Sequence, residues 1–549
     1  MSATAFVNGS VFDGRHHLGA ATVVVQDGLI CAVGPTDEVP VPAGAAVVDV
    51  AGGLVSPGFV DAHVHALQGG LERTRCDLSG GVTREDYLET VRGYADSHRG
   101  DPDVGWVLGG GWAMAAFPGG TPVAADLDAI VPDRPVFLPN RDHHGAWVNS
   151  RALELAGIHR DSPEPAHGRV ERDADGHPTG TLHEGAMDLV SRCVPPTSAR
   201  EYRRALLEGQ SYLHSLGVTG WQDAIIGAYA GMDDPGPTYL AAARSGDLSA
   251  HVVGALWWDR DGGDEQVAAL VERREQLTHG RFRATSVKVM QDGVCENGTA
   301  ALTAPYLDRC GHATTNRGHS FIDPQALRRY VTLLAQEGFQ VHVHAIGDRG
   351  VTEALDAFEA AATASAGRDL RHHLAHLQLV DPKDVGRFGA LGVAANMQAL
   401  WACLDEQMVA LTLPVLGEDR ASWQYPFGAL HRASTRLVAG SDWPVSSPDP
   451  LSAIHVAVNR WAYDAPGRAG SEPFLPEQAL DLPTAFAAYT SGSAWANHRD
   501  DAGFVAVGRV ADLAVLDRDP FVGAPADIGA TQVVSTWVDG APVWSRPCS

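Results

Sequence analysis

The stretch GFVDAHVHALQGG, residues 58–70, decides the fold, because a short apolar run ends there in two histidines that are one residue apart. Side chains alternate across a β-strand with a period of two, so His63 and His65 point to the same face of the predicted strand. Seven more β-rich runs follow, at residues 217–224, 250–258, 284–293, 339–348, 371–378, 392–398 and 436–442. Helical segments lie between the later runs, and eight strands alternating with helices predict an α/β fold, a (β/α)8 TIM-like barrel.

The two ends of the chain differ from this middle part. Residues 1–55 and 500–549 contain short β-branched runs separated by tight turns, a pattern typical of β-hairpins. Because chain ends often lie close together, we expect both to build one small β-sandwich domain. The barrel is predicted to comprise residues 56–66 and 217–499. Residues 67–216 are too many for one crossover and predict an inserted α/β subdomain after the first strand.

Composition excludes some classes of partner. The formal net charge is -26, whereas nucleic acids and anionic membranes are bound by basic surfaces, so we expect neither as a partner and expect a small-molecule substrate. Seven scattered cysteines without a CxxC pair do not indicate a disulfide framework. The first residues lack the features of a signal peptide, so a cytoplasmic location is expected. A homodimer is an open alternative for the assembly.

Polar residues stand at the ends of the predicted strands, where barrel enzymes carry their catalytic groups. They are His63, His65, Lys288, His342, His344, His376 and Asp442. Neutral imidazole and carboxylate oxygen suit zinc and similar divalent ions, and a catalytic site keeps one position open for water. The strand ends therefore predict a metal centre at the mouth of the barrel.

Each of these residues also has an ordinary structural explanation. A lone histidine on a strand is more often a core or surface residue than a ligand, and two-residue matches such as HxH occur by chance. Asp442 could be a turn residue before Pro444, and Lys288 could pair with Asp292. The joint occurrence at successive strand ends favours the metal centre.

Several longer segments carry a family resemblance. They are GLVSPGFVDAHVHA, DHHGAWVNSRALELAGI, TGTLHEGA, VKVMQDGVCENGTAALTAPY, VHAIGD, LAHLQ, AGSDWPV and GRVADLAVLDRDP, which together extend from about residue 50 to 520. With them the chain resembles the metal-dependent amidohydrolase superfamily, and within it the amidohydrolase-3 branch that includes the N-substituted formamide deformylases.

The resemblance implies roles for the strand-end residues. His63 and His65 match the ligands of the more buried metal, and Asp442 matches the ligand of that metal that also takes a proton from the attacking water. His344 and His376 match the ligands of a second metal, and Lys288 matches a lysine that is often carboxylated and bridges the two. One or two divalent ions are therefore expected, with zinc as the expected element. Without carboxylation of Lys288, the site could hold a single metal.

The resemblance also bears on the substrate. His144 matches a recurrent histidine of this branch and is a candidate catalytic residue, as an oxyanion donor or substrate contact. Glu296 and Asn297 follow the fourth strand and could line the mouth of the barrel. Tryptophans near predicted strand ends or loops are candidates for an apolar substrate pocket, among them Trp112, Trp147 and Trp401.

The predicted function is metal-dependent hydrolysis of an amide-type C–N bond with metal-activated water. The substrate could be an N-substituted formamide with an apolar or aromatic substituent. Hydrolysis of a lactone, ester, cyclic amide or amino-heterocycle in the same centre stays open, because function belongs to the site and not to the scaffold. A non-catalytic metal-binding barrel is the third alternative.

Overall fold

The computed structural model describes residues 3–100, 104–165, 168–229, 232–308, 310–364, 366–463 and 472–547. At its centre, eight parallel strands pair in the order in which they occur in the chain. These strands are β6 (Phe59–Val64), β13 (Val218–Ile226), β14 (His251–Trp257), β16 (Phe282–Met290), β17 (Gln340–Ala345), β18 (His373–His376), β19 (Ala394–Met397) and β20 (Leu437–Ala439). A short strand, β15 (Thr278–His279), pairs antiparallel with β16. All eight strands of the predicted barrel are confirmed.

The last strand of this sheet returns to the first. Directly after β20, the backbone N–H of Asp442 donates to the carbonyl oxygen of His63 at 2.7 Å. Gly440 lies so close to β6 that a Cβ atom at this position would come within 2.6 Å of the Cβ of His63, so any side chain there would hold the two segments apart. The sheet therefore forms a nearly closed barrel.

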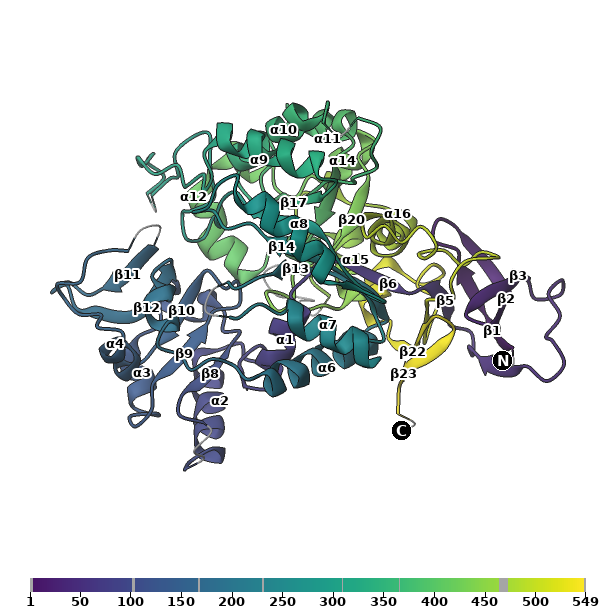
Figure 1. Ribbon diagram of the computed structural model, residues 1–549, viewed down its shortest axis with the longest axis horizontal. Coiled ribbons are helices and arrows are strands. Elements are labelled where there is room, and N and C mark those ends of the chain that lie inside the picture. Colours follow the sequence, from purple (N-terminus) through teal and green to yellow (C-terminus); the bar gives the residue numbers. More distant parts are fainter. Residues whose placement is uncertain are drawn as a thin grey trace.

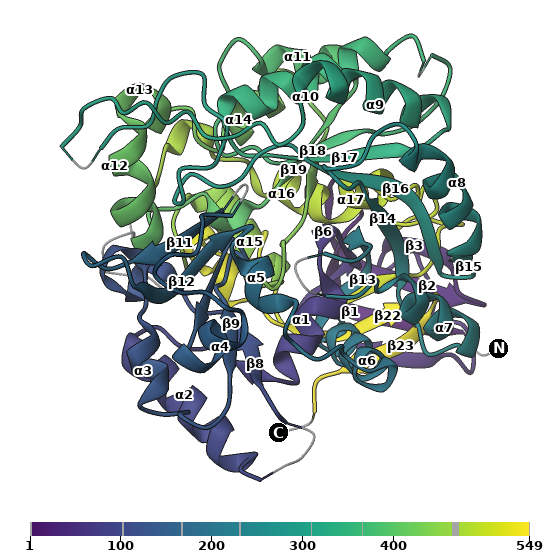
Figure 2. The same cartoon turned by 60° about the vertical axis from the view of Figure 1, so that its left-hand side comes forward.

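Helices cover the outside of the barrel, as Figures 1 and 2 show. In α9 the Asp323 carboxylate accepts hydrogen bonds from the N–H groups of Gln325 and Ala326, and a proline occupies the first turn, both common at helix starts. The helices after β6 that belong to the barrel are α6 (Ala199–Ser215), α7 (Gly236–Ser245), α8 (Gln266–Gln276), α9 (Pro324–Gln336), α10 (Asp348–Ala361), α11 (Val385–Leu391), α12 (Leu413–Leu416), α13 (Glu418–Ala421), α14 (Phe427–Arg432), α15 (Pro450–Asn459), α16 (Leu482–Ala487) and α17 (Ser493–Ala496).

Alternation along the strands separates core from site. In β16, Val287 and Val289 belong to the hydrophobic cluster that joins sheet and helices, whereas Lys288 between them contacts His63 inside the barrel. In β17, Val341 and Val343 belong to the same cluster, and His342 between them also contacts His63. The period of two therefore packs valines against helices and turns ionisable side chains inward.

Both ends of the chain meet in one hydrogen-bonded sheet beside the barrel, drawn in purple and yellow in Figure 1. Its order is β23-β22-β21-β5-β1-β2-β3, with β4 beside β1, and β5 pairs antiparallel with β21. The strands are β1 (Thr4–Phe12), β2 (His17–Gln26), β3 (Leu29–Pro35), β4 (Ala46–Asp49), β5 (Leu54–Pro57), β21 (Leu513–Leu516), β22 (Val533–Val538) and β23 (Ala541–Ser545). A division of these strands into the two layers of a sandwich stays a prediction.

A second sheet lies in the long segment between β6 and β13, drawn in blue in Figure 2. Its order is β11-β12-β10-β9-β8-β7. The strands are β7 (Cys76–Asp77), β8 (Val107–Gly110), β9 (Val136–Pro139), β10 (Gly145–Val148), β11 (Gly168–Arg172) and β12 (Pro178–Glu184), and the α-helices that precede α6 in the segment are α1 (Ala66–Arg73), α2 (Arg84–Ser97), α3 (Ala124–Asp128), α4 (Ser150–Leu155) and α5 (Met187–Ser191). The predicted domain boundaries stay predictions. Among the helices of the described residues, none has both the length and the apolar character needed to cross a membrane.

Candidate metal centre

Three side chains meet where the first and last barrel strands end. His63 is in β6, His65 follows it, and Asp442 follows β20. The Asp442 Oδ1 atom lies 3.1 Å from the Nε2 atom of His63 and 3.1 Å from the Nε2 atom of His65. The carboxyl ends of parallel strands share one face of a barrel, so residues far apart in the sequence can converge there. The arrangement gives two nitrogen donors and one oxygen donor around a common point.

These donor atoms have the character expected of metal ligands. Asp442 Oδ1 is buried without a hydrogen-bond partner among the described residues, and the same is true of both ring nitrogens of His376. Buried polar atoms nearly always have a partner, so a group of orphaned ones requires an explanation. Two imidazoles and a carboxylate are a ligand set that zinc and similar ions accept. The residues present therefore fit a divalent metal ion.

The other predicted ligands lie directly beside this group. The Lys288 Nζ atom is 3.4 Å from His63 Nε2, and the rings of His344 and His376 are 4.4 Å apart. The His376 ring is also 4.8 Å from that of His63, which joins the two groups into one cluster. The structure thus brings all six predicted ligands together.

Charge and burial set the protonation of the cluster. Burial alone raises the pKa of Asp442, but attraction to the adjacent His63 outweighs burial and holds this pKa well below its usual range. Burial, together with the positive charge of Lys288, lowers the pKa of His63 to about 3. Neutral imidazole and ionised carboxylate are the forms that bind metals.

Lys288 is buried deeply enough to lose its proton near neutral pH. Burial lowers its pKa to about 7, although Asp442 opposes this shift. The chain has two lysines, Lys288 and the exposed Lys383, so a lysine at the centre of the barrel is a marked exception in its composition. This scarcity is a sequence signal for Lys288 that complements its place at a strand end.

A second layer of side chains orients His63. The Nδ1 atom of His63 lies 2.8 Å from Nε2 of His342, and Nδ1 of His342 lies 2.8 Å from Oε1 of Gln222. A histidine ligand commonly has its other ring nitrogen fixed by such a partner, which sets the tautomer and the ring orientation. His342 is thus a positioning residue for His63, a role that the HxH pattern in β17 did not reveal.

His144, the predicted catalytic histidine, is paired with a carboxylate. Its Nδ1 atom lies 3.0 Å from each carboxylate oxygen of Glu184, and its ring centre is 6.1 Å from that of His344. Burial alone lowers the pKa of His144, but the charge and hydrogen bond of Glu184 outweigh burial and raise the pKa to about 9. His144 is therefore a cation at neutral pH, beside the cluster.

Glu184 was not assigned from the sequence, although it lies in the motif TGTLHEGA. It reaches His144 because β12 pairs with β10, which brings His183 opposite Gly145, and because the N–H of Glu184 donates to the carbonyl oxygen of His144. The Thr299 hydroxyl donates to Glu184 Oε1 at 3.0 Å and holds the carboxylate in place.

Several residues in and around the cluster have unusual backbone angles. Positive φ angles occur at His143 (61°), Glu184 (49°), His376 (82°) and Asp442 (57°). Such angles are uncommon outside glycine, and when they persist they cluster at functional sites. Four of them lie around this one cluster.

The residues predicted to contact substrate have different surroundings. Trp112 and Trp147 are fully buried and pack against each other and Phe117, with ring centres of the two tryptophans 6.3 Å apart. Their contact with substrate stays a prediction, and neither lines the cavity described below. Trp401 stacks on His376 with a ring distance of 5.4 Å, so it borders the cluster.

Glu296 and Asn297 are held by hydrogen bonds. The Thr412 hydroxyl donates to Glu296 Oε1 at 2.5 Å, and Asn297 Nδ2 donates to the carbonyl oxygen of His144 at 3.1 Å. Asn297 therefore supports the backbone of the candidate catalytic histidine, and its substrate contact, like that of Glu296, stays a prediction.

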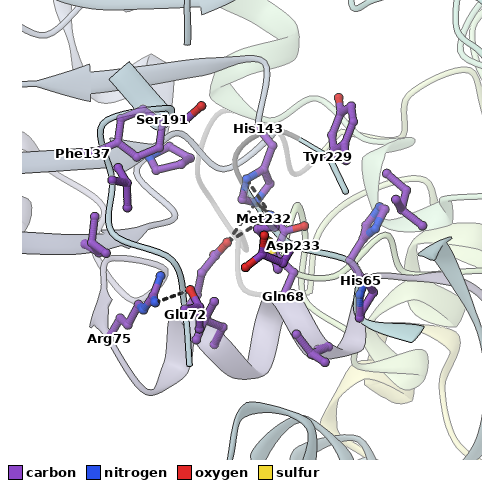
Figure 3. A pocket seen from close by; sticks show the side chains of 18 of the residues that line it. His65, Gln68, Glu72, Arg75, Phe137, His143, Ser191, Tyr229, Met232 and Asp233 are labelled. Carbon is purple, nitrogen blue, oxygen red and sulfur yellow. Dashed lines mark hydrogen bonds and ion pairs between the residues drawn. The ribbon is translucent and has the colours of Figure 1, made fainter. Parts of the chain in front are cut away.

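A cavity of about 110 Å³ extends from His65 along helix α1, and we name it the α1 cavity. Figure 3 shows His65, Gln68 and Glu72 on one side of it and Phe137, His143 and Ser191 on another. The inserted segment and the loop after β13 close the remaining walls.

Sequence comparison places the chain among known proteins. A family profile described as "Amidohydrolase family" matches residues 46–544. The chain belongs to the amidohydrolase family. This assignment agrees with the family resemblance of the motifs.

Individual relatives carry varied names. The chain is 30% identical to "Protein LONG AFTER FAR-RED 3" of Arabidopsis thaliana over 97% of its own length and 90% of that protein. It is 28% identical to "N-substituted formamide deformylase" of Arthrobacter pascens, over 96% of this chain and 95% of that one. An uncharacterized metal-dependent hydrolase from Pyrococcus furiosus is 26% identical, with a TM-score of 0.68 over 94% of this chain and 99% of the other. This chain shares its fold with that metal-dependent hydrolase.

Proposed function

We propose that the protein is a metal-dependent hydrolase of amide-type C–N bonds, with N-substituted formamides as its substrate class. The observation that carries this proposal is the buried Asp442 Oδ1 atom, which has no hydrogen-bond partner among the described residues and lies 3.1 Å from two imidazole nitrogens. His63, His65 and Asp442 would hold one divalent ion, and His344 and His376 a second. The relative named as a formamide deformylase supports the substrate class.

A divalent ion held there supplies a hydroxide nucleophile near neutral pH and polarises the scissile carbonyl. Asp442 has two oxygens for two tasks. Its Oδ1 atom points between His63 and His65 as a ligand, and Oδ2, on the side of His376, is free to take the proton of the attacking water. Because its pKa is held below its usual range, Asp442 is an ionised carboxylate at neutral pH, and it would accept this proton and return it to the leaving nitrogen.

His144 would stabilise the negative charge that develops on the carbonyl oxygen. Glu184 occupies its Nδ1 side, which leaves the Nε2–H group free to donate. A preorganised donor aimed at a developing oxyanion is often the largest single contribution to catalysis. The raised pKa of His144 keeps this donor protonated through the neutral range.

Lys288 would bridge the two metals as a carbamate. Protonated lysine has no lone pair to offer, but a pKa lowered to about 7 leaves a large neutral fraction at physiological pH. The neutral amine would attack carbon dioxide: one N–C bond forms, one C–O π bond of carbon dioxide opens with its electron pair going to oxygen, and the nitrogen loses one proton to solvent, which gives an anionic group with two oxygens. Its place 3.4 Å from His63 Nε2 supports this role.

A substrate panel tests the proposed function. Metal-loaded protein is offered N-substituted formamides, longer acyl amides, lactones, esters, cyclic amides and amino-heterocycles, and release of acid and amine is followed by chromatography. The proposal expects the highest kcat/KM on formamides and no turnover by Asp442→Asn. Turnover confined to lactones or heterocycles would contradict the bond assignment, and turnover of none would contradict enzymatic function.

A further inference from the structure

The α1 cavity begins at a candidate metal ligand and ends at a carboxylate. His65 is the residue before the first turn of α1, and Gln68 and Glu72 follow on the same face of the helix, since residues three and four apart are neighbours. Seven residues separate His65 from Glu72, a distance of about 10 Å along a helix. This is the reach of a chain of about seven or eight bonds.

The walls between these two ends are largely apolar. Many of them come from α1, the inserted sheet and α5, and they include Leu67, Leu71, Leu108, Phe137 and Met187. Apolar walls with a few convergent polar groups are typical of small-molecule sites. A hydrocarbon chain that starts at the metal centre would be covered along its length.

The cavity walls carry more acidic than basic side chains. Glu72, Asp223 and Asp233 line them, against one arginine, Arg75, and Glu72 marks the end away from His65. The guanidinium of Arg75 is already engaged, because its Nη2 atom donates to the Thr197 hydroxyl at 2.8 Å and lies 3.7 Å from Glu201 Oε1. Little positive charge is therefore left over for the carboxylates.

Glu72 in particular forms no ion pair with an arginine or lysine among the described residues. Its contacts there involve Oε1, which accepts from Gln68 Nε2 at 3.4 Å and lies 3.3 Å from His143 Nε2. Burial and the charge of His65 lower the pKa of His143 to about 3, so this imidazole is neutral. Burial and repulsion from Asp77 raise the pKa of Glu72 to about 8, against the hydrogen bond from Gln68 and the attraction of Arg75.

We propose that the α1 cavity binds the nitrogen substituent of the substrate and prefers an apolar chain that ends in an ammonium group, which pairs with Glu72. The inference rests on the proposed function, since it takes the scissile nitrogen to lie at the metal centre beside His65. It adds a specificity-determining residue, Glu72, and a substrate class, the N-formyl derivatives of diamines or of similar cationic amines.

Direct binding tests this without turnover. Isothermal titration of the metal-loaded protein at pH 8 compares N-acetylhexylamine with mono-N-acetyl-1,6-diaminohexane (called the diamine below), of which only the second carries an ammonium group at this pH. The diamine is expected to bind at least about tenfold more tightly, a difference of about 1.4 kcal/mol. In Glu72→Gln the two affinities are expected to become equal.

Two further variants keep the test decisive. Glu208→Gln removes a carboxylate of α6 that pairs with Arg73 outside the cavity, and it should retain the preference for the diamine. Leu108→Trp places bulk in the cavity wall and should weaken binding of both compounds at least about tenfold, which provides a test if Glu72→Gln does not fold. Unchanged affinities in Leu108→Trp, or a preference that survives in Glu72→Gln, would overturn the inference.

The outcomes separate the two proposals. Diamine binding that depends on Glu72, in a protein that hydrolyses no amide, would contradict the proposed function and leave the cavity assignment standing. Hydrolysis of formamides with equal binding of both compounds would contradict the cavity assignment alone.

Discussion

Two groups of histidine and aspartate lie at opposite ends of the barrel, and they differ in what surrounds them. His63, His65 and Asp442 meet at the carboxyl ends of the strands, and His251, Asp512 and Asp539 meet where β14 begins, against the terminal sheet. In both groups, the potential ligand atoms lie within 4.8 Å of one another. Proximity alone does not distinguish them.

Their hydrogen-bond partners do distinguish them. In the second group, Arg281 donates to Asp539, Arg499 donates to Asp512 at 3.1 Å, and the N–H of Asp539 donates to Asp512 Oδ1 at 2.8 Å. The acceptors are therefore occupied, and the group is an ion-pair network that ties the barrel to the terminal sheet. In the first group Asp442 Oδ1 is left without a partner among the described residues. A metal site is therefore indicated by a buried ligand atom that has no hydrogen-bond partner, and not merely by a short distance between the ligand atoms.

The largest difference between the two groups is expected in activity. Asp442→Asn removes the proposed metal ligand and proton acceptor together, so kcat/KM should fall by about 10³-fold or more. Asp539→Asn, the matched change in the second group, should leave kcat/KM unchanged. The comparison would fail if both variants lost activity alike, as measured by initial rates on the best substrate of the panel.

The next effect concerns Lys288. After equilibration with ¹³C-labelled carbon dioxide at pH 8, the wild type should show one carbamate resonance in its carbon NMR spectrum. Lys288→Gln should lose it and bind about one metal equivalent in place of about two. Lys383→Gln is the control, because the only other lysine is exposed and paired with Asp381. A carbamate signal that persists in Lys288→Gln would exclude the bridging role.

His144 should set the basic limb of the pH profile. Its pKa is raised to about 9 by Glu184, so the protonated donor is present at neutral pH and is lost as pH rises through about 9. In Glu184→Gln burial remains without the opposing charge, so the limb should shift to lower pH. At pH 8 activity should drop by about 10- to 100-fold. The measurement is log kcat/KM against pH for both proteins, and an unmoved basic limb would contradict the pairing.

The smallest effect is expected in the contribution that the second group makes to the stability of the protein. Asp539→Asn should lower the free energy of unfolding by about 1 kcal/mol, since its partners are partly exposed and screened. Burial alone raises the pKa of Asp539, but His251 and Arg281 outweigh it and hold this pKa at about 2. The ionised carboxylate thus stabilises the fold above about pH 4, and the difference from wild type should vanish as pH falls through about 2. Urea titrations at several pH values measure it, and a difference that grew on acidification would contradict this sign.

The cluster of candidate metal ligands could be predicted from the sequence because its members lie near strand ends. His63, Lys288, His344, His376 and Asp442 each lie within the last three residues of a strand or follow one, and barrel geometry directs such residues to one face. The alternation of valine with ionisable residues in β16 and β17 carried the same information, so the eight strands could be predicted with the ligands.

The contacts made by the inserted segment were harder to predict from the sequence. Glu184 reaches His144 only through the register of β10 and β12, which the separate motifs do not specify. Trp112 and Trp147 looked like loop aromatics available to substrate, yet burial of their large apolar surfaces against Phe117 places them inside a hydrophobic cluster. The α1 cavity forms where α1, the inserted sheet and the loop after β13 meet, so no single stretch of sequence encodes it.

Metal content tests the central claim most directly. Protein purified after expression in zinc-supplemented medium is dialysed and measured by inductively coupled plasma mass spectrometry. We expect about one or two equivalents of a divalent metal in the wild type and in the double variant His251→Asn with Asp539→Asn, and loss of at least one equivalent in His65→Asn with Asp442→Asn. A wild type without bound metal, or equal metal content in the two double variants, would contradict the account.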